Sequence, residues 1–197
     1  KKILLLLGIF IWNIYSANPF IGIWQTDANK KINIVLNSQV YYEYENVLNS
    51  TINGSGTSDR ISLTLPINGK YKIKIFPQNS GFRFNYNQYG GSDLYFLEII
   101  NWGQINWNDN LSNLFNNKVN LTISATDIPN FSNVTDFSYM FYNCKMISNI
   151  PNINLWNVSN STTFKRMFSE ADLYNSPINN WDTHNALTLE SMFNGAL

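Results

Sequence analysis

Apolar and polar residues alternate in short runs through residues 18–100, and this pattern predicts β-strands. The runs are KINIVL, VYYEYENVL, RISLTLPI, KYKIKIF, FRFNY and LYFLEII, and turn-forming stretches such as NGSGTSD, QNSG and YGGSD separate them. Side chains with a period of two lie on opposite faces of a strand. Asn68-Gly69 also favours a tight turn that leads into an alternating strand. We therefore expect six short strands in an antiparallel sandwich or barrel.

A different pattern begins near residue 101, where one apolar motif recurs. The segments NVTDFSYMF (133–141), NSTTFKRMF (160–168) and NALTLESMF (185–193) each begin with Asn, have an apolar residue four positions later and end in Met-Phe. A degraded copy, NDNLSNLFNN, precedes them. A repeat of 25 to 27 residues is typical of a solenoid, in which each unit buries its apolar face against its neighbours.

The apolar triad of each repeat is predicted to form the core. Phe137, Met140 and Phe141 have the i, i+3, i+4 spacing of one face of a short helical turn. Thr135 or Asp136 is the expected cap of that turn. Two equivalent triads are expected to stack on the first: Phe164-Met167-Phe168 and Leu189-Met192-Phe193. Segments such as NIPNINLWNV would then form irregular or extended return legs, because Pro prevents helix continuation.

Residues that vary between the copies are free to face solvent and to contact a partner. Tyr139, Tyr142, Lys165 and Arg166 are the candidate partner-binding residues, and Glu170 varies in the same way. Exposed aromatic and cationic side chains often supply much of the binding energy of a protein interface. We expect any recognition by the repeat region to involve this set.

The N-terminus resembles a secretory signal peptide. Residues 1–17 consist of KK, the apolar run ILLLLGIFIW and the polar segment NIYSA, with Ala17 as the last residue before cleavage. The apolar run is short for a membrane span. The predicted organisation is a signal peptide at 1–17, a β-sandwich domain at 18–100 and a repeat region at 101–197 that is truncated at its C-terminus. The expected location is extracellular, on a bacterial cell surface.

Composition removes several classes of function. Lys plus Arg and Asp plus Glu are both 13, which leaves no net charge to attract nucleic acid. Cys144 is the single cysteine and cannot form an internal disulfide. Its neighbours Tyr142, Asn143 and Met146 favour a buried packing residue over a reactive thiol.

Candidate catalytic and metal-binding residues are few. His184, the only histidine, takes the position that Ser159 has in the preceding copy, which favours a solvent-facing repeat residue over a general base. Glu43 and Glu45 lie on one face of a strand at a spacing that suits a glycosidase pair, but a solvated strand face is the simpler interpretation. NWNDN has oxygen ligands for calcium without the fixed loop of a known calcium site. We predict no catalytic, cofactor-binding or metal-ligating residue and no cofactor.

The repeats also resemble a known family. VTDFSYMFYNCKMISNIPNINLWNVSN and TFKRMFSEADLYNSPINNWDTHN are similar to the BspA-type leucine-rich repeats of bacterial surface proteins, also described as a mycoplasma domain of unknown function. Residues 97–117 resemble the entry segment of those proteins, with Trp102-Gly103 and Trp107 in the expected places. FIGIWQTDANKKINIVLN resembles the immunoglobulin-like or polycystic-kidney-disease-type module that precedes such repeats. That module often has a Trp-Gly-Asp-Gly turn, which YEYENVLNSTINGSG replaces here.

The resemblance implies a fold and a class of function. The predicted fold class is mixed α+β, with an N-terminal antiparallel β-sandwich followed by a short leucine-rich-repeat-like solenoid. The implied function is non-catalytic binding or adhesion to a protein or glycan of a host, a matrix or another cell. A surface-display scaffold with recognition elsewhere on the full-length chain is the alternative, and a carbohydrate-active enzyme is a distant third.

Overall fold

Residues 20–101 supply five strands of a six-stranded sheet, and the sixth strand comes from the repeat region. The computed structural model describes residues 18–85 and 95–196. The strands are β1 (Phe20–Gln25), β2 (Lys31–Asn46), β3 (Asn53–Thr64), β4 (Lys70–Pro77), β5 (Phe96–Asn101) and β6 (Thr122–Ile123). Their order in the sheet is β3-β2-β4-β1-β5-β6. All neighbours are antiparallel except β5 and β6, so the sheet is mixed.

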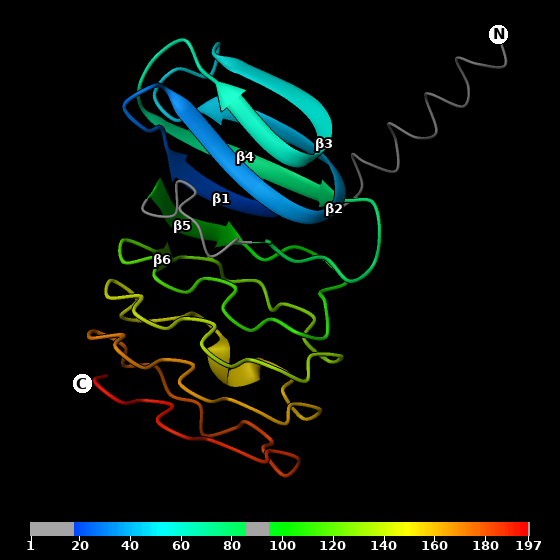
Figure 1. Cartoon of the computed structure of the whole chain (residues 1–197), viewed down its shortest axis with the longest axis vertical. Coiled ribbons are helices and arrows are strands. Elements are labelled where there is room, and N and C mark those ends of the chain that lie inside the picture. Colours follow the sequence, from blue (N-terminus) through cyan, green and yellow to red (C-terminus); the bar gives the residue numbers. More distant parts are fainter. Residues whose placement is uncertain (1–17, 86–94, 197) are drawn as a thin grey trace, which may run out of the picture.

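The long strands β2 and β3 give the sheet its curvature. The register between them shifts between Val35 and Val40, which divides β2 into two parts. Only the second part, from Val40 onward, also pairs with β4, and just before it Leu36 bridges Phe84 instead. Figure 1 shows β2 and β3 as long curved ribbons. The predicted KINIVL and VYYEYENVL runs are therefore one continuous strand, and the sandwich-like shape comes from one folded sheet.

Two glycines explain an incorrect turn prediction. The segment NGSGTSD belongs to β3, where Gly54 pairs with Tyr44 and Gly56 pairs with Tyr42. A Cβ atom on Gly54 would lie 2.6 Å from the Tyr44 hydroxyl oxygen, and one on Gly56 would lie 2.6 Å from that of Tyr42. The glycines are needed because the tyrosine rings cross the neighbouring strand at these points, and no turn is involved.

The prediction of a mixed α+β fold is wrong. The described residues contain no α-helix, and a short 3-10 helix at Ile153–Leu155 lies in a return leg. The expected helical turn at Phe137 is instead a chain of overlapping β-turns. Each of these turns is closed by a backbone amide that donates to the carbonyl three residues earlier. The pairs are Met140 with Phe137, Tyr142 with Tyr139 and Cys144 with Phe141. Likewise, Asp136 accepts hydrogen bonds from both the amide and the hydroxyl of Ser138 at 2.8 and 2.6 Å, and caps no helix.

Left-handed backbone at every fourth residue prevents these turns from becoming a helix. The positive-φ positions of the motif form two columns across the repeats: Asn113, Tyr139, Arg166 and Ser191, and then Asn117, Asn143, Glu170 and Gly195. A right-handed helix excludes such values, because its residues all have φ near −63°. A chain of turns therefore retains the i, i+3, i+4 apolar spacing without helical hydrogen bonds.

The alternate amides of each turn chain connect one coil to the next. The amides of Phe137, Tyr139 and Phe141 donate to the carbonyls of Thr163, Lys165 and Met167 at 2.9 to 3.0 Å. The same ladder joins the coil at 111–117 to the second and the third coil to the last. Every rung has the same polarity, since the earlier coil donates and the later coil accepts. Figure 1 shows these coils stacked below the sheet, with the C-terminus at the far end.

Apolar side chains form continuous columns through the stack. Phe115, Phe141, Phe168 and Phe193 stack in order, with ring centroids 5.5 to 5.7 Å apart. Phe137 likewise stacks on Phe164 at 5.8 Å. The prediction that the triads form core is confirmed for the inner coils, where Phe137, Met140 and Phe141 are fully buried. In the last coil, Leu189 and Phe193 remain 51% and 41% exposed.

The sheet covers the first coil. The guanidinium of Arg83 donates to the carbonyls of Asn110 and Ser112 at 3.0 and 3.1 Å. These are the carbonyls that correspond to the ladder acceptors Asp136 and Ser138 of the next coil. One apolar cluster runs from Phe20 in β1 through the coils. The sheet and the repeats therefore share a single core. The part of the chain that the structure describes has no helix long and apolar enough to cross a membrane.

Candidate partner-binding surface

The predicted partner-binding residues lie on the outer side of the turn ladder. Three of them are in contact: the Tyr139 and Tyr142 ring centroids are 5.7 Å apart, and the Arg166 guanidinium lies 5.9 Å from the Tyr139 ring centroid. All are half-buried. Arg166 belongs to the coil after Tyr139, so its cation–π contact crosses the interface between coils. We call Tyr139, Tyr142, Lys165 and Arg166 the ladder patch.

Lys165 occupies the edge of the ladder patch. Its ammonium forms an ion pair with Glu190 of the last coil at 2.8 Å. The hydrogen bond between these side chains raises the pKa of Lys165 and lowers the pKa of Glu190. Both side chains are solvent-accessible, so the pair contributes little to stability. By contrast, the described carboxylates form no ion pair with Arg166.

Tyr139 and Arg166 have an unusual backbone conformation for their residue types. Their φ angles are 58° and 52°, in the left-handed region that Asn and Gly adopt most readily. The first coil has Asn113 at the equivalent position. A bulky side chain there costs about 1–2 kcal/mol per residue. The ladder patch therefore places a tyrosine and an arginine where asparagine would suit the backbone better.

Arg166 also retains unused hydrogen-bonding capacity. Its Nε atom is buried and has no hydrogen-bond partner among the described residues. Because arginine presents five donors in a planar fork, a ligand that reaches this nitrogen would need an oxygen acceptor. The patch thus combines two aromatic rings, one guanidinium without an ion pair to the described carboxylates and one paired ammonium, a combination suited to a carbonyl- or carboxylate-bearing partner.

The candidate glycosidase carboxylates are already paired. Glu43 lies 3.2 Å from the Lys74 ammonium, and Glu45 forms an ion pair with Lys72. The hydrogen bond from Lys72 lowers the pKa of Glu45. A general acid needs a raised pKa so that it keeps its proton near neutral pH. The two glutamates line a depression of about 320 Å³. Their contacts therefore favour the interpretation that they are ion-paired, solvated carboxylates.

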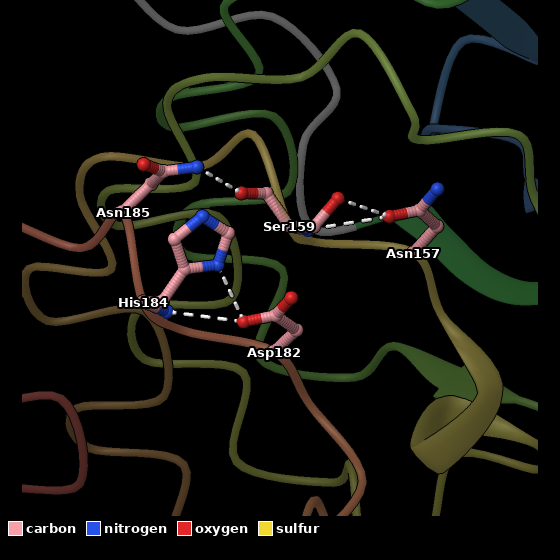
Figure 2. A network of polar contacts seen from close by, with 5 residues as sticks. All are labelled: Asn157, Ser159, Asp182, His184 and Asn185. Carbon is pink, nitrogen blue, oxygen red and sulfur yellow. Dashed lines mark hydrogen bonds and ion pairs between the residues drawn. The ribbon is translucent and has the colours of Figure 1, made fainter.

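His184 belongs to a polar edge that recurs along the stack. Its Nδ1 atom lies 2.7 Å from the Asp182 carboxylate, and its hydrogen bond lowers the pKa of that carboxyl. Figure 2 shows the corresponding pair one coil earlier, where the Ser159 hydroxyl donates to Asn157 at 2.8 Å. The Asn185 amide donates to the Ser159 carbonyl at 2.8 Å and links the two. Within this network Ser159 bonds to Asn157 and not to His184, so the geometry is that of two turns and not of a catalytic triad.

The remaining candidates have structural contacts. The Cys144 thiol is fully buried and donates to the Phe115 carbonyl at 3.0 Å. Burial raises its pKa to about 12. In NWNDN, Asn108 accepts a hydrogen bond from the amide of Asn110, and Asn110 accepts from Ser112. These side-chain oxygens stabilise turns at the entry to the first coil.

Sequence reasoning missed the features that organise the surface. Residue types gave a signal for the left-handed positions, since Asn113, Asn117 and Asn143 recur at spacings of four and 26 residues, and Asn tolerates this backbone. The donor role of Arg83 had no comparable signal, because the two carbonyls it caps lie 27 and 29 residues away.

Comparison with known proteins separates the two halves of the chain. Residues 109–197 match the family model described as a Mycoplasma protein of unknown function, DUF285. The match begins at the first coil and covers all the coils. It is consistent with the mycoplasma-type repeat. Neither a curated protein nor a solved structure matches the chain.

Proposed function

We propose that the protein is a secreted or cell-surface repeat protein that binds a protein or glycan without catalysis. The DUF285 match supports a repeat-type protein and carries no activity of its own. In this proposal the coils form a rigid support, and the ladder patch makes the contact. The host, matrix or neighbouring-cell partner would be recognised by aromatic stacking and by hydrogen bonds to Arg166.

The observation that carries the proposal is the conformational cost at Tyr139 and Arg166. Both residues have left-handed backbone, with φ angles of 58° and 52°, and asparagine already occupies the same position in the first coil. Backbone strain of this kind persists where the surrounding structure enforces it and is often associated with function. The cation–π contact between the coils holds both side chains at the surface. Stability alone would favour asparagine at both positions.

A matched pair of variants tests the proposal. Tyr139→Asn with Arg166→Asn removes the aromatic and cationic groups while giving both positions the residue that the first coil has. The protein would be screened against immobilised matrix proteins, mucins and glycans. For any ligand found, we expect roughly 10- to 100-fold weaker binding, because truncating a central interface residue typically costs 1–3 kcal/mol, with an unchanged or higher melting temperature.

The control variant is Glu170→Asn. Glu170 is also left-handed, with a φ of 60°, and the preceding coil has Asn143 at its equivalent position. The backbone change is the same, but the side chain lies outside the ladder patch. Equal losses of affinity in the two variants, or full binding by the double variant, would contradict the assignment of the patch.

A surface-display scaffold remains the second candidate function. The continuous hydrogen-bond ladder and phenylalanine column support it, because both extend a rigid stack without requiring a ligand. A chain that binds nothing in the screen, yet holds a fused reporter domain away from a cell surface, would favour this function over adhesion.

A further inference from the structure

Three turns meet at one end of the sheet. They connect β1 to β2, β2 to β3 and β3 to β4 at residues 26–30, 47–52 and 65–69. Backbone hydrogen bonds join them: the amide of Thr26 donates to the Gly69 carbonyl at 3.0 Å, and that of Val47 donates to the Lys70 carbonyl at 2.9 Å. In Figure 1 these turns lie at the upper left of the sheet, with the coils below it. We call the three turns, together with the adjoining Lys31 and Lys70, the turn tip.

Large apolar side chains are exposed on the turn tip. Val47, Leu48 and Ile67 are 48%, 96% and 42% exposed, and the described residues of 18–101 include no other large apolar side chain that is exposed to this degree. The turn that carries Leu48 is held in place, because the buried Asn46 side chain accepts hydrogen bonds from the amides of Leu48 and Asn49 at 3.0 Å. Apolar side chains gathered on a fixed surface turn indicate an interaction site.

The turn tip is also cationic. Lys30, Lys31 and Lys70 are exposed, and none of them forms an ion pair with a carboxylate of residues 18–85 or 95–196. Asp27 is the acidic residue of these turns, and its carboxylate accepts hydrogen bonds from the amides of Asn29 and Lys31, both at 2.8 Å. The apolar side chains are therefore accompanied by three lysines whose charge is available to an anionic partner.

An apolar hollow continues the turn tip onto the sheet. Its volume is about 640 Å³, and Val47 and Lys70 lie on its border with the tip. Ile23, Leu97 and Ile100 line it on the side of the sheet. The two glutamates of the hollow already contact a lysine and a serine of the same chain. The hollow thus offers apolar surface beside an unpaired ammonium.

The composition of the turn tip favours a lipid surface over a protein. Protein interfaces are enriched in Tyr, Trp and Arg and depleted of Lys, whereas these turns contain neither an aromatic residue nor an arginine. Aliphatic side chains flanked by lysines match the two layers of an anionic bilayer, which are the hydrocarbon and the negatively charged headgroups above it.

We propose that the turn tip binds the surface of an anionic lipid bilayer. Val47 and Leu48 insert among the acyl chains, and Lys30, Lys31 and Lys70 contact the headgroup phosphates. This binding is separate from the ladder patch, because the two surfaces share no residue. It also lies outside the DUF285 match, which begins at residue 109.

Binding to vesicles tests the role of the apolar side chains. The chain from residue 18 onward would be used, since the apolar residues 1–17 would bind vesicles by themselves. We expect it to sediment with phosphatidylcholine vesicles that contain about 30% phosphatidylglycerol, and less so as the salt concentration rises. Leu48→Asn should weaken this binding roughly 10- to 100-fold. The control Leu187→Asn changes a coil residue that is 85% exposed and should bind as the parent does.

A second pair of variants tests the role of the lysines. Lys30→Gln with Lys70→Gln should weaken binding to the anionic vesicles roughly 10- to 30-fold, because each lysine near such a surface contributes modestly. Lys145→Gln with Lys165→Gln is the control, since it changes the net charge equally on the coils. Equal losses in the two double variants would overturn the assignment of the lysines.

A fluorophore at position 48 reports insertion directly. In Leu48→Cys the new thiol can be labelled with a nitrobenzoxadiazole dye while the buried Cys144 is not. Emission should increase and shift to the blue when anionic vesicles are added. No vesicle binding, binding without this shift, or an equal loss in Leu187→Asn would overturn the proposal. Self-association through Leu48 in the absence of vesicle binding would overturn it as well, and would assign the turn tip to a second copy of the chain.

Discussion

Phe141→Ala should be among the most destabilising single substitutions in the coils. The Phe141 side chain is fully buried, and its ring lies between those of Phe115 and Phe168 with both centroids 5.5 Å away. Its amide is a ladder donor to Met167 at 2.9 Å. Because ladder bonds hold the coils on both sides at fixed spacing, the cavity left by the ring cannot close. A buried Phe→Ala substitution costs about 3–5 kcal/mol, and we expect the upper half of that range.

The matched control is Phe193→Ala, at the open end of the same column. That ring is 41% exposed and stacks on Phe168 at 5.7 Å, so its removal should cost roughly 1–2 kcal/mol. Calorimetry would follow both variants, since a chain of this size loses roughly 2–4 °C in melting temperature per kcal/mol. Denaturant unfolding followed by tryptophan fluorescence would report whether the coils unfold together. A loss below about 1 kcal/mol for Phe141→Ala, or one no larger than for Phe193→Ala, would refute the column as the stabilising core.

Three further predictions concern the sheet, the junction and the thiol. Gly54→Ala should cost roughly 1–3 kcal/mol in thermal unfolding, because the new Cβ meets the Tyr44 ring, whereas Ser55→Ala on the opposite face should be close to neutral. Arg83→Lys should cost roughly 1–3 kcal/mol, because one of the carbonyls of Asn110 and Ser112 loses its donor; a melting curve that superimposes on the parent would contradict the capping role. Cys144, with a pKa near 12, should resist a thiol reagent at pH 8, where about one thiol in 10⁴ is ionised, and should react at the rate of unfolding. Since folding raises this pKa, stability should fall as the pH rises above about 9, and the slope should be smaller in Cys144→Ser, which lacks the contribution of the thiol.

The apolar pattern predicted the burial of the repeats but not their backbone. Phe137, Met140 and Phe141 were assigned correctly to the core, because stacking requires a recurrent apolar face in any solenoid. The i, i+3, i+4 spacing did not separate a helical turn from a chain of β-turns, since both place those side chains on one face. Only the left-handed residues distinguish them, and Tyr139 and Arg166 are poor markers of that conformation.

The alternating pattern predicted the regions of β2 to β5, but it missed β1 and β6, and FRFNY forms isolated bridges where a strand was expected. It also misjudged the positions where glycine had a second meaning. KYKIKIF formed β4 with its expected alternation, whereas Gly54 and Gly56 were interpreted as turn residues although tyrosines lie against them. The candidate surface was chosen from sequence variation between the copies. The structure places both Tyr142 and Arg166 in contact with the Tyr139 ring. That arrangement depends on the coil spacing, which a single sequence does not contain.

The uniform polarity of the ladder also bears on how the stack should respond to a pulling force. Each coil is held to the one before it by alternate backbone bonds that join residues 24 to 26 positions apart, so a pull on the C-terminal end loads one coil interface at a time. The stack should peel in discrete steps, each releasing about 26 residues and about 90 Å of chain. Such a chain would lengthen under load while its sheet and inner coils stayed folded.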